Sequence, residues 1–162
     1  MKTFCQTAAI GAVLLLIFGY SAQPGDQLTQ AQQENIKKEI TGLWDTIIAR
    51  SQRLDAAGVL QFYSPAIVAF STDGVRTGFE EIRKYFVDFC NSATLNKWTP
   101  FHLEFIVVAK DKVVISVDGK TEYIFKSGNS ITYNPSHYTI AFAKSSGQWK
   151  VVYYHFSGFK EK

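Results

Sequence analysis

The chain has 162 residues, about the length of one average domain; 46% are hydrophobic and 19% are charged. This composition excludes disordered, collagen-like and coiled-coil proteins. The formal net charge is only +3 and the basic residues are scattered, which argues against a nucleic-acid partner. Aromatic residues make up 15% of the chain, which indicates a large core, an internal cavity or an apolar contact surface.

The first residues have the pattern of a secretory signal peptide. Lys2 precedes the uncharged run 8–20, which is too short to span a membrane but has the length of a signal hydrophobic region. Small residues follow at Gly19, Ser21 and Ala22, so we expect cleavage near residue 22, with an uncleaved anchor as the alternative. The expected organisation is a signal peptide 1–22, a linker 23–27, a domain 28–158 and a tail 159–162, in a secreted or periplasmic protein.

The cysteines fit this organisation. Cleavage would remove Cys5 and leave Cys90 as the one cysteine of residues 23–162. No internal disulfide could then form, so packing must hold the domain together. Cys90 lies in a helical apolar stripe, which favours a core position over a nucleophilic role.

The first stretch of the domain predicts two helices. Over 28–54, apolar residues recur at steps of three and four. Thr29, with Gln32 three residues later, has the spacing of a capping box at the start of this helix. Asp55 then suits the N-cap of a short helix over 56–63, which the following Ser-Pro pair would end.

A short hairpin and a third helix are expected next. The run 66–71 is strand-like, a Thr-Asp-Gly turn follows, and 75–76 would form the return strand. Thr77 and Glu80 have the spacing of a second capping box. The helix after them carries an apolar stripe at helical spacing, namely Ile82, Tyr85, Phe86, Phe89 and Cys90.

The second half of the chain predicts strands. Runs of β-branched and aromatic residues, separated by short polar turns, cover roughly 101–108, 113–125, 137–144 and 149–156. Asp118-Gly119 inside the second run fits either a hairpin or a glycine bulge in one long strand. The order of elements predicts an α+β fold with the helices on one face of a curved sheet.

The last two strands allow a register to be predicted. A three-residue loop over 145–147 would pair His137 with His155 and Thr139 with Tyr153 on one face. We expect this face, which also carries Trp149, to point inward, because the polar ends of both strands fall on the other. That outer face would carry Lys144, Gln148 and Lys150 and an apolar set suited to a partner: Tyr138, Ile140, Phe142, Val152 and Tyr154.

A set of landmarks runs along the chain in a recognisable order: Trp44, Asp55, Phe62-Tyr63, Asp73-Gly74, Gly78, Phe79-Glu80-Glu81-Ile82, Phe86, and 147–152 through His155 and Ser157. Together they resemble the SnoaL-like, ketosteroid-isomerase-like branch of the nuclear transport factor 2 superfamily over about residues 28–158. The resemblance implies a cone of three helices wrapped by a strongly curved, mixed six-stranded sheet. It also implies a deep pocket at the open end, frequent homodimers through the outer sheet face, and Gly119 as a bulge in a long strand.

The resemblance does not choose a reaction. The superfamily includes isomerases, dehydratases, cyclases, epoxide hydrolases and non-catalytic association domains. Laying the ketosteroid-isomerase pattern over the first strand puts Phe70 where those enzymes have their general-base aspartate. A phenyl ring cannot accept a proton, so an isomerase of that type is disfavoured.

Two histidines are the sequence's main candidates for catalysis. In the predicted register His137 and His155 would face the pocket side by side and could act as acid and base near neutral pH. Alternatively, each bonds a neighbouring backbone group or a tyrosine hydroxyl, or both bind a metal together with His102 or Glu104. No metal and no cofactor are expected, because the sequence has neither short metal-ligand spacings nor a phosphate-binding loop.

Three functions are consistent with these observations. The leading hypothesis is a secreted homodimeric domain that binds a small apolar or aromatic molecule. The alternatives are a dehydratase, hydrolase or cyclase using His155 with His137 or a carboxylate, and a dimerisation or protein-interaction module. The expected pocket wall consists of Trp44, Tyr63, Phe86, Thr139, Trp149 and Tyr153.

Overall fold

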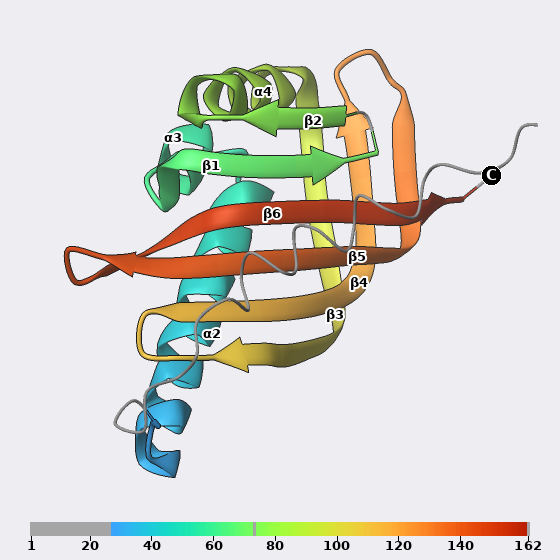
Figure 1. The fold of residues 1–162 in the computed structure, drawn as a ribbon. Helices are drawn as coiled ribbons and strands as arrows, with labels where there is room; N and C mark the ends of the chain where they lie inside the picture. The colour runs from blue at the N-terminus through green and yellow to red at the C-terminus, as the bar shows by residue number, and fades with distance from the viewer. Residues whose placement is uncertain (1–26, 73, 162) are drawn as a thin grey trace, which may run out of the picture.

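The computed structural model describes residues 27–161 apart from residue 73, so the predicted signal peptide, its cleavage site and Cys5 lie outside the described residues. Three helices, α2 (Gln30–Gln52), α3 (Ala56–Leu60) and α4 (Phe79–Ser92), pack against a six-stranded sheet (Figure 1). None of the helices in this part of the chain has the length and apolar character needed to cross a membrane.

The sheet is mixed, with the strand order β2-β1-β6-β5-β4-β3. β1 and β6 are parallel and all other neighbours are antiparallel. The strands are β1 (Tyr63–Ser71), β2 (Gly74–Thr77), β3 (Ala93–Val108), β4 (Lys112–Phe125), β5 (Ser130–Ser145) and β6 (Gln148–Lys160). The predicted α+β fold is confirmed, although β3 begins well before residue 101 and β6 continues into the expected tail.

The three long strands bend at one level. Their registers shift between Pro100 and His102 in β3, at Gly119 in β4, and between Tyr133 and Ser136 in β5. Bulges in neighbouring strands add twist and curvature, so the far ends of these strands turn upward toward α4 (Figure 1). Gly119 is therefore a bulge within one continuous strand and not the tip of a hairpin.

The predicted N-terminal capping interactions are present in the first two helices. The capping box of α2 is confirmed: the Thr29 N–H donates to Gln32 Oε1 at 2.8 Å and the Gln32 N–H donates to Thr29 Oγ1 at 3.2 Å. Asp55 caps α3 as predicted, accepting from the Gly58 N–H at 2.8 Å. α3 ends at Leu60, earlier than predicted, and Tyr63 already pairs with Val151 of β6.

The second predicted capping box is wrong. α4 has Gly78 as its N-cap, with φ 82°, and no side chain caps it. The helix thus begins one residue later than the Thr77 and Glu80 spacing requires. Glu81, the third helical residue, instead accepts from the Thr77 N–H at 2.7 Å.

The register predicted for the last hairpin is also wrong. Its loop is two residues long, and both Ser146 and Gly147 have positive φ, 50° and 80°, as in a type I′ turn. A bulge beyond the turn shifts the pairing again, because Phe142 lies opposite Val151 but Ala141 lies opposite Tyr153. His137 therefore faces Ser157 across the strands, not His155.

In β5 the two faces are inverted relative to the prediction, whereas Trp149 and Val151 of β6 lie on the helix side, as predicted. The set expected outside is in the core: Tyr138, Ile140 and Phe142 are at most 7% exposed. Residues 137, 139 and 141 alternate with them and point away from the helices. The prediction took the polar residues at the strand ends to mark the outer face. It is wrong because Lys144 projects on the helix side but beyond the core, with Nζ 3.4 Å from Glu39 Oε2.

The core fills the space between the helices and the concave face of the sheet. Ile40, Trp44 and Ile47 of α2, at steps of four and three, are each at most 4% exposed. They meet the alternating inward residues of the central strands. Those with almost no exposure are Val113, Ile115, Val117, Ile140, Phe142 and Val151.

Candidate functional site

A small cavity lies between α2, α4 and the concave face of the sheet. Its volume is about 60 Å³, enough for a few water molecules, and we call it the inner cavity. Helix residues form one wall and strand residues the other. The lining residues are Trp44, Ile47, Ile48, Ser51, Gln52, Val59, Tyr63, Tyr85, Phe86, Phe89, Asn96, Trp98, Tyr123, Tyr138 and Tyr154.

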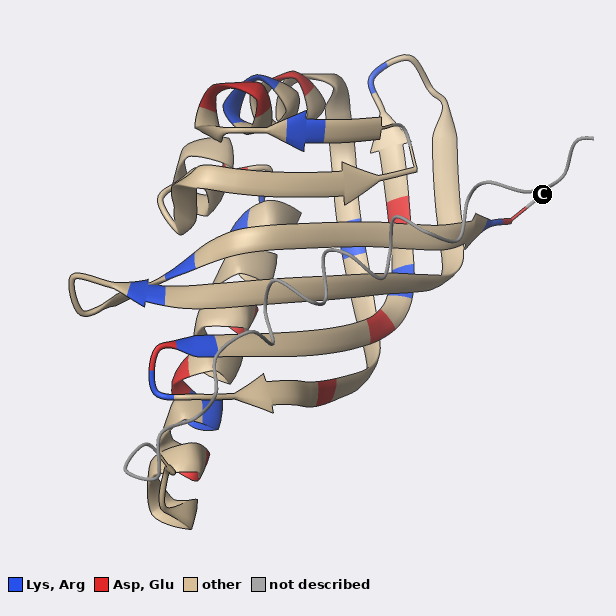
Figure 2. Cartoon of the chain, viewed as in Figure 1, with Lys and Arg blue, Asp and Glu red and all other residues tan. Residues whose placement is uncertain are grey.

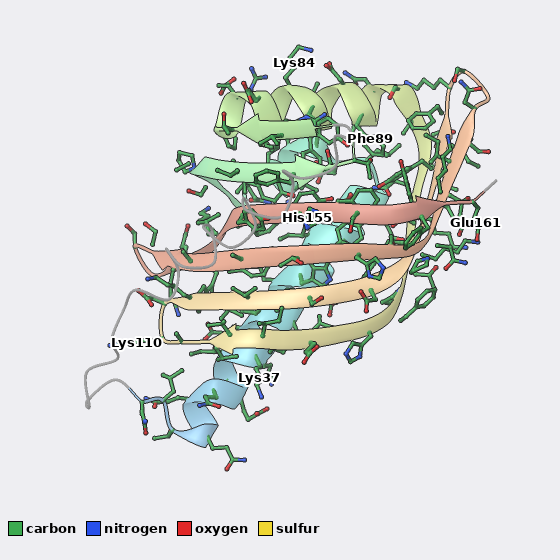
Figure 3. The ribbon with its side chains drawn as sticks, turned by 45° about the vertical axis from the view of Figure 1, so that its right-hand side comes forward. Lys37, Lys84, Phe89, Lys110, His155 and Glu161 are labelled. Carbon is green, nitrogen blue, oxygen red and sulfur yellow. The ribbon has the colours of Figure 1, made fainter. Side chains whose placement is uncertain are left out.

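A larger and more open hollow of about 910 Å³, here the outer groove, lies beside the inner cavity. It runs between α4, the β1–β2 hairpin and the upturned ends of β4 and β5. Tyr85, Phe89, Tyr123 and Tyr154 line both spaces. Figure 3 labels Phe89 near the end of α4, beside these upturned strands. The four aromatic side chains therefore separate the groove from the cavity.

Aromatic rings dominate the wall of the inner cavity. Trp44 and Trp98 meet edge to face with ring centroids 5.8 Å apart, and Tyr138 lies 6.1 and 6.0 Å from them. Tyr63 meets Phe86 in the same way at 5.5 Å. Among the residues described, the lining includes no histidine, carboxylate, lysine or arginine. The cavity thus has no group that exchanges protons readily near neutral pH.

Buried hydroxyls form a chain at the bend of the sheet. Tyr138 and Thr121 are hydrogen-bonded through their hydroxyls at 2.9 Å, and Thr121 donates to Ser136 at 2.9 Å. Burial raises the pKa of Tyr138 to about 12 and raises the pKa of Tyr123 and Tyr154 well above the ordinary value of 10. These phenols therefore stay protonated near neutral pH and serve as hydrogen-bonding groups, not as bases.

A second polar contact joins the end of α2 to β3. Asn96 Nδ2 donates to the Ser51 carbonyl at 3.0 Å and to Ser51 Oγ at 2.8 Å. The backbone N–H of Trp98 donates to Gln52 Oε1 at 3.2 Å. These bonds fix the first part of β3, and with it the Trp98 indole, against the helix.

Charged residues gather around the outer groove. Figure 2 shows acidic and basic positions alternating along α4, while β1 has no charged residue. The Arg76 guanidinium lies 3.9 Å from the ring centroid of Tyr85 and donates to Ser71 Oγ at 2.9 Å. The groove therefore has a charged entrance and an aromatic inner end.

Three of the six residues expected in the pocket wall line the inner cavity: Trp44, Tyr63 and Phe86. The other three do not. Trp149 packs beside α2, where its Nε1 donates to Glu39 Oε2 at 2.8 Å. Thr139 lies on the outer sheet face, opposite Ser116 and His155. Tyr153 is on that face too, with its ring 5.8 Å from Phe70.

The histidines also lie on the outer face of the sheet. His137 Nδ1 is 2.6 Å from Asp118 Oδ1, and both side chains are partly exposed, at 43% and 37%. His155, labelled on β6 in Figure 3, pairs with Thr139 and with Phe70. The predicted pair of histidines inside the pocket is wrong, because the sheet separates both from the inner cavity.

His102 and Glu104 share the outer face as well, opposite Asp118 and Ser116. Within the described part of the chain, no group of three histidine, cysteine or acidic side chains is close enough to hold a metal ion. Cys90 is half-buried, and burial raises the pKa of its thiol. The structure therefore provides no metal centre or activated thiol from these residues.

Six lining aromatic residues were not predicted: Tyr85, Phe89, Trp98, Tyr123, Tyr138 and Tyr154. Tyr85 and Phe89 lie in the predicted apolar stripe of α4, so helical spacing alone could have identified them. For Tyr138, the available signal was side-chain size. The alternating set Tyr138, Ile140 and Phe142 is larger and more apolar than its neighbours, which favours the buried face.

Comparison with known proteins agrees with the fold. The family model of the SnoaL-like domain matches residues 40–160. A nuclear transport factor 2-like superfamily protein from Salmonella enterica serovar Typhimurium has 16% identity and a TM-score of 0.70, covering 80% of this chain and 94% of its own. A hexachlorocyclohexane dehydrochlorinase from Novosphingobium barchaimii LL02 has 14% identity and a TM-score of 0.70, covering 82% and 93%. No curated protein matches the sequence.

Proposed function

Because the chain belongs to the SnoaL-like domain family, we propose that it binds a small, uncharged aromatic or apolar molecule at the junction of the inner cavity and the outer groove. The observation that carries the proposal is the lining of the inner cavity, which is aromatic, hydroxyl-bearing and without charged groups. Ligand sites of this kind bury an apolar body and use a few polar groups for orientation.

The same lining favours binding over acid–base catalysis. A general base must lie within hydrogen-bond reach of the proton that it removes. The lining tyrosines are held in the protonated form by burial, and His137 and His155 face away from the cavity. A dehydratase, hydrolase or cyclase that uses pocket histidines is therefore not supported.

The binding test uses N-phenyl-1-naphthylamine, a neutral aromatic probe whose fluorescence rises in apolar sites. Phe89→Glu places a carboxylate between groove and cavity, where a bound apolar molecule would remove it from water. The matched control is Val87→Glu, because Val87 is half-buried on the same helix and lines neither space. We expect Phe89→Glu to weaken binding at least about tenfold and Val87→Glu to leave it nearly unchanged.

Two results would contradict this proposal. Equal binding by both variants would place the probe elsewhere on the molecule. Absence of any fluorescence increase or melting shift with the unmodified protein would remove the binding function itself.

We also propose a homodimer through the outer face of the sheet. An apolar row crosses four neighbouring strands there, since Val114 pairs with Ala141, Ala141 with Tyr153, and Tyr153 with Val68. Phe70 packs beside Tyr153 on the same face. A contiguous apolar patch on a sheet face favours a protein contact.

Sedimentation velocity tests the dimer. Ala141→Arg, in the middle of the apolar row, should shift the protein to a monomer. Ala143→Arg is the control, because this residue has the same orientation but lies near the strand end between Lys112 and Lys150. A monomeric unmodified protein would rule out this interface.

We propose, finally, that residues 1–22 direct export and are removed, which gives a secreted or periplasmic protein. The support is the uncharged run 8–20 followed by small residues. Sequencing the N-terminus of protein from the native source should find a start near residue 23. A chain that still begins at Met1 would contradict cleavage.

A further inference from the structure

His155 borders the apolar row on the outer face of the sheet. It lies on β6 (Figure 3), two residues after Tyr153, so the two side chains are on the same face. Opposite His155 on β1 is Phe70, whose ring centroid is 5.8 Å from that of Tyr153. The His155 side chain is already half-buried in the single chain. A second copy that covers Tyr153 and Phe70 must therefore cover this imidazole as well.

The residues that face His155 provide no negative charge for a protonated ring. Within the described part of the chain, Thr139 of β5 and Phe70 of β1 lie opposite it. Tyr153 and Ser157 flank it along β6 on the same face. Burial raises the pKa of Tyr153, so its phenol is uncharged near neutral pH. A proton on His155 would therefore place an uncompensated charge beside the apolar row.

The charged side chains of the neighbouring strands do not face His155. Arg76 of β2 lies opposite Ala69, which is buried on the helix side, and its guanidinium is over the ring of Tyr85. Glu104 of β3 shares the outer face but is three strand spacings away, about 14 Å. This separation exceeds the Debye length of about 8 Å at physiological ionic strength, so Glu104 offers little compensation.

The other two histidines of the outer face have a carboxylate beside them. His137 Nδ1 is 2.6 Å from Asp118 Oδ1. His102 of β3 lies opposite the same aspartate. Asp118 therefore offsets a positive charge at this end of the face, whereas the same charge on His155 has no partner among the described side chains.

The cost of covering His155 depends on its protonation. An imidazole ordinarily titrates near pH 6.5, so the ring is mostly neutral above this pH and mostly charged below it. A neutral imidazole can be buried in an apolar contact at modest cost, but an unpaired cation loses its hydration there. The separated subunits thus bind protons at this position more readily than the dimer does. By linkage, the contact is fully stable above about pH 6.5 and weakens as the pH falls below it.

We infer that the outer-face homodimer is sensitive to acid, and that protonation of His155 in each copy separates the two subunits. The inference rests on the proposed dimer and adds its regulation. A twofold dimer contains two copies of His155, so two protons are taken up on dissociation. The dissociation constant should therefore rise by up to about 100-fold for each pH unit below about 6.5.

Sedimentation velocity measures the dimer between about pH 8 and about pH 5.5, a range in which imidazoles titrate and ordinary carboxyl groups do not. We expect a dimer at the higher pH and a monomer at the lower pH. Raising the pH again should restore the dimer. Circular dichroism at both pH values checks that the acid monomer is folded.

Two substitutions of His155 and one control assign the effect. His155→Gln removes the titrating group and should stay dimeric at both pH values. His155→Arg makes the charge permanent and should be monomeric at both. The control is His137→Gln, because His137 lies on the same face of β5 and its charge is offset by Asp118. This variant should keep the pH dependence of the unmodified protein.

Each outcome decides one of the two proposals. A dimer that persists at the lower pH would overturn the acid sensitivity and leave the dimer intact. Equal pH dependence with and without His155→Gln would assign the effect to another group and would also overturn the inference. A protein that is monomeric at the higher pH would contradict the dimer itself. If acid unfolds the protein, His155→Arg at the higher pH remains decisive, because a dimeric variant would overturn the role of this charge.

Discussion

The two faces of the sheet differ in chemistry as well as in burial. The concave face carries the tryptophans and tyrosines of the inner cavity. The outer face carries all three histidines of the chain, His102, His137 and His155, together with Asp118 and Glu104. The side chains best suited to acid–base chemistry are therefore on the face without the inner cavity. What this domain does depends on which face each strand residue occupies, not on which residue types it contains.

The largest expected effect tests the assignment of the two faces. Ile140 is fully buried on the concave face, and its neighbour Thr139 lies on the outer face. Ile140→Ala leaves a cavity in the core and should lower the free energy of unfolding by about 2–5 kcal/mol. Thr139→Ala should change it by no more than about 0.5 kcal/mol. Urea denaturation of both variants measures the difference; similar losses would mean that the faces are assigned wrongly.

The helical half of the fold could be predicted because its signals are local. The Thr29–Gln32 capping box, the Asp55 cap and the α4 stripe each depend on residues within one or two turns of helix. Trp44 and Phe86 were placed at the cavity for the same reason, since a period of 3.6 residues tolerates small errors in the ends of a helix.

For the strands, the sequence predicts their approximate positions but not their pairing register or the face on which each side chain lies. The sequence Ser145-Ser146-Gly147 fits a loop of two or of three residues, and the structure adopts two, with Ser146 at positive φ. The bulge beside Ala141 has no sequence signal. Because side chains alternate with a period of two, an error of one residue moves every side chain to the opposite face. This is why Tyr153 was expected inside and lies outside, whereas His137 was expected inside because the polar strand ends favoured the opposite face of β5 as the outer one.

Raising the pH should lower the free energy of unfolding through the buried tyrosines of the concave face. Burial raises the pKa of Tyr138 to about 12, whereas an unfolded tyrosine has a pKa of about 10. The folded state therefore binds the proton more tightly, so its stability is fully present below pH 10 and falls as the pH rises toward 12. Tyr138 alone should lose about 3 kcal/mol over this range.

Urea titrations at several pH values between 8 and 12 measure this loss. Tyr138→Phe removes the ionisable group and should flatten the fall, although it also breaks the bond to Thr121. Tyr153→Phe is the outer-face comparison and should alter the pH dependence less, because Tyr153 is only partly buried. A stability unchanged from pH 10 to 12 would contradict the burial of these phenols.

A smaller effect is expected at the bulge that positions Trp98. Gly119→Ala would bring a Cβ to 2.6 Å from both a backbone carbonyl and the indole nitrogen, so the backbone or the ring must shift. We expect a loss of about 1–3 kcal/mol. The Trp98 indole N–H signal should also move in a ¹H–¹⁵N spectrum while that of Trp149 does not. An unchanged spectrum would show that the indole is not held by this contact.

The smallest effect is expected where sequence analysis placed the catalytic pair. His137 Nδ1 is 2.6 Å from Asp118 Oδ1, but both side chains are partly exposed, and exposed polar contacts of this kind contribute at most about 1 kcal/mol. His137→Gln should therefore leave the melting temperature and the binding of N-phenyl-1-naphthylamine almost unchanged, and His155→Gln should do the same. A large loss of probe binding in either variant would mean that the sheet does not separate these histidines from the ligand. Unchanged binding, together with the loss caused by Phe89→Glu, would place recognition on the concave face, where the side chains are aromatic and uncharged.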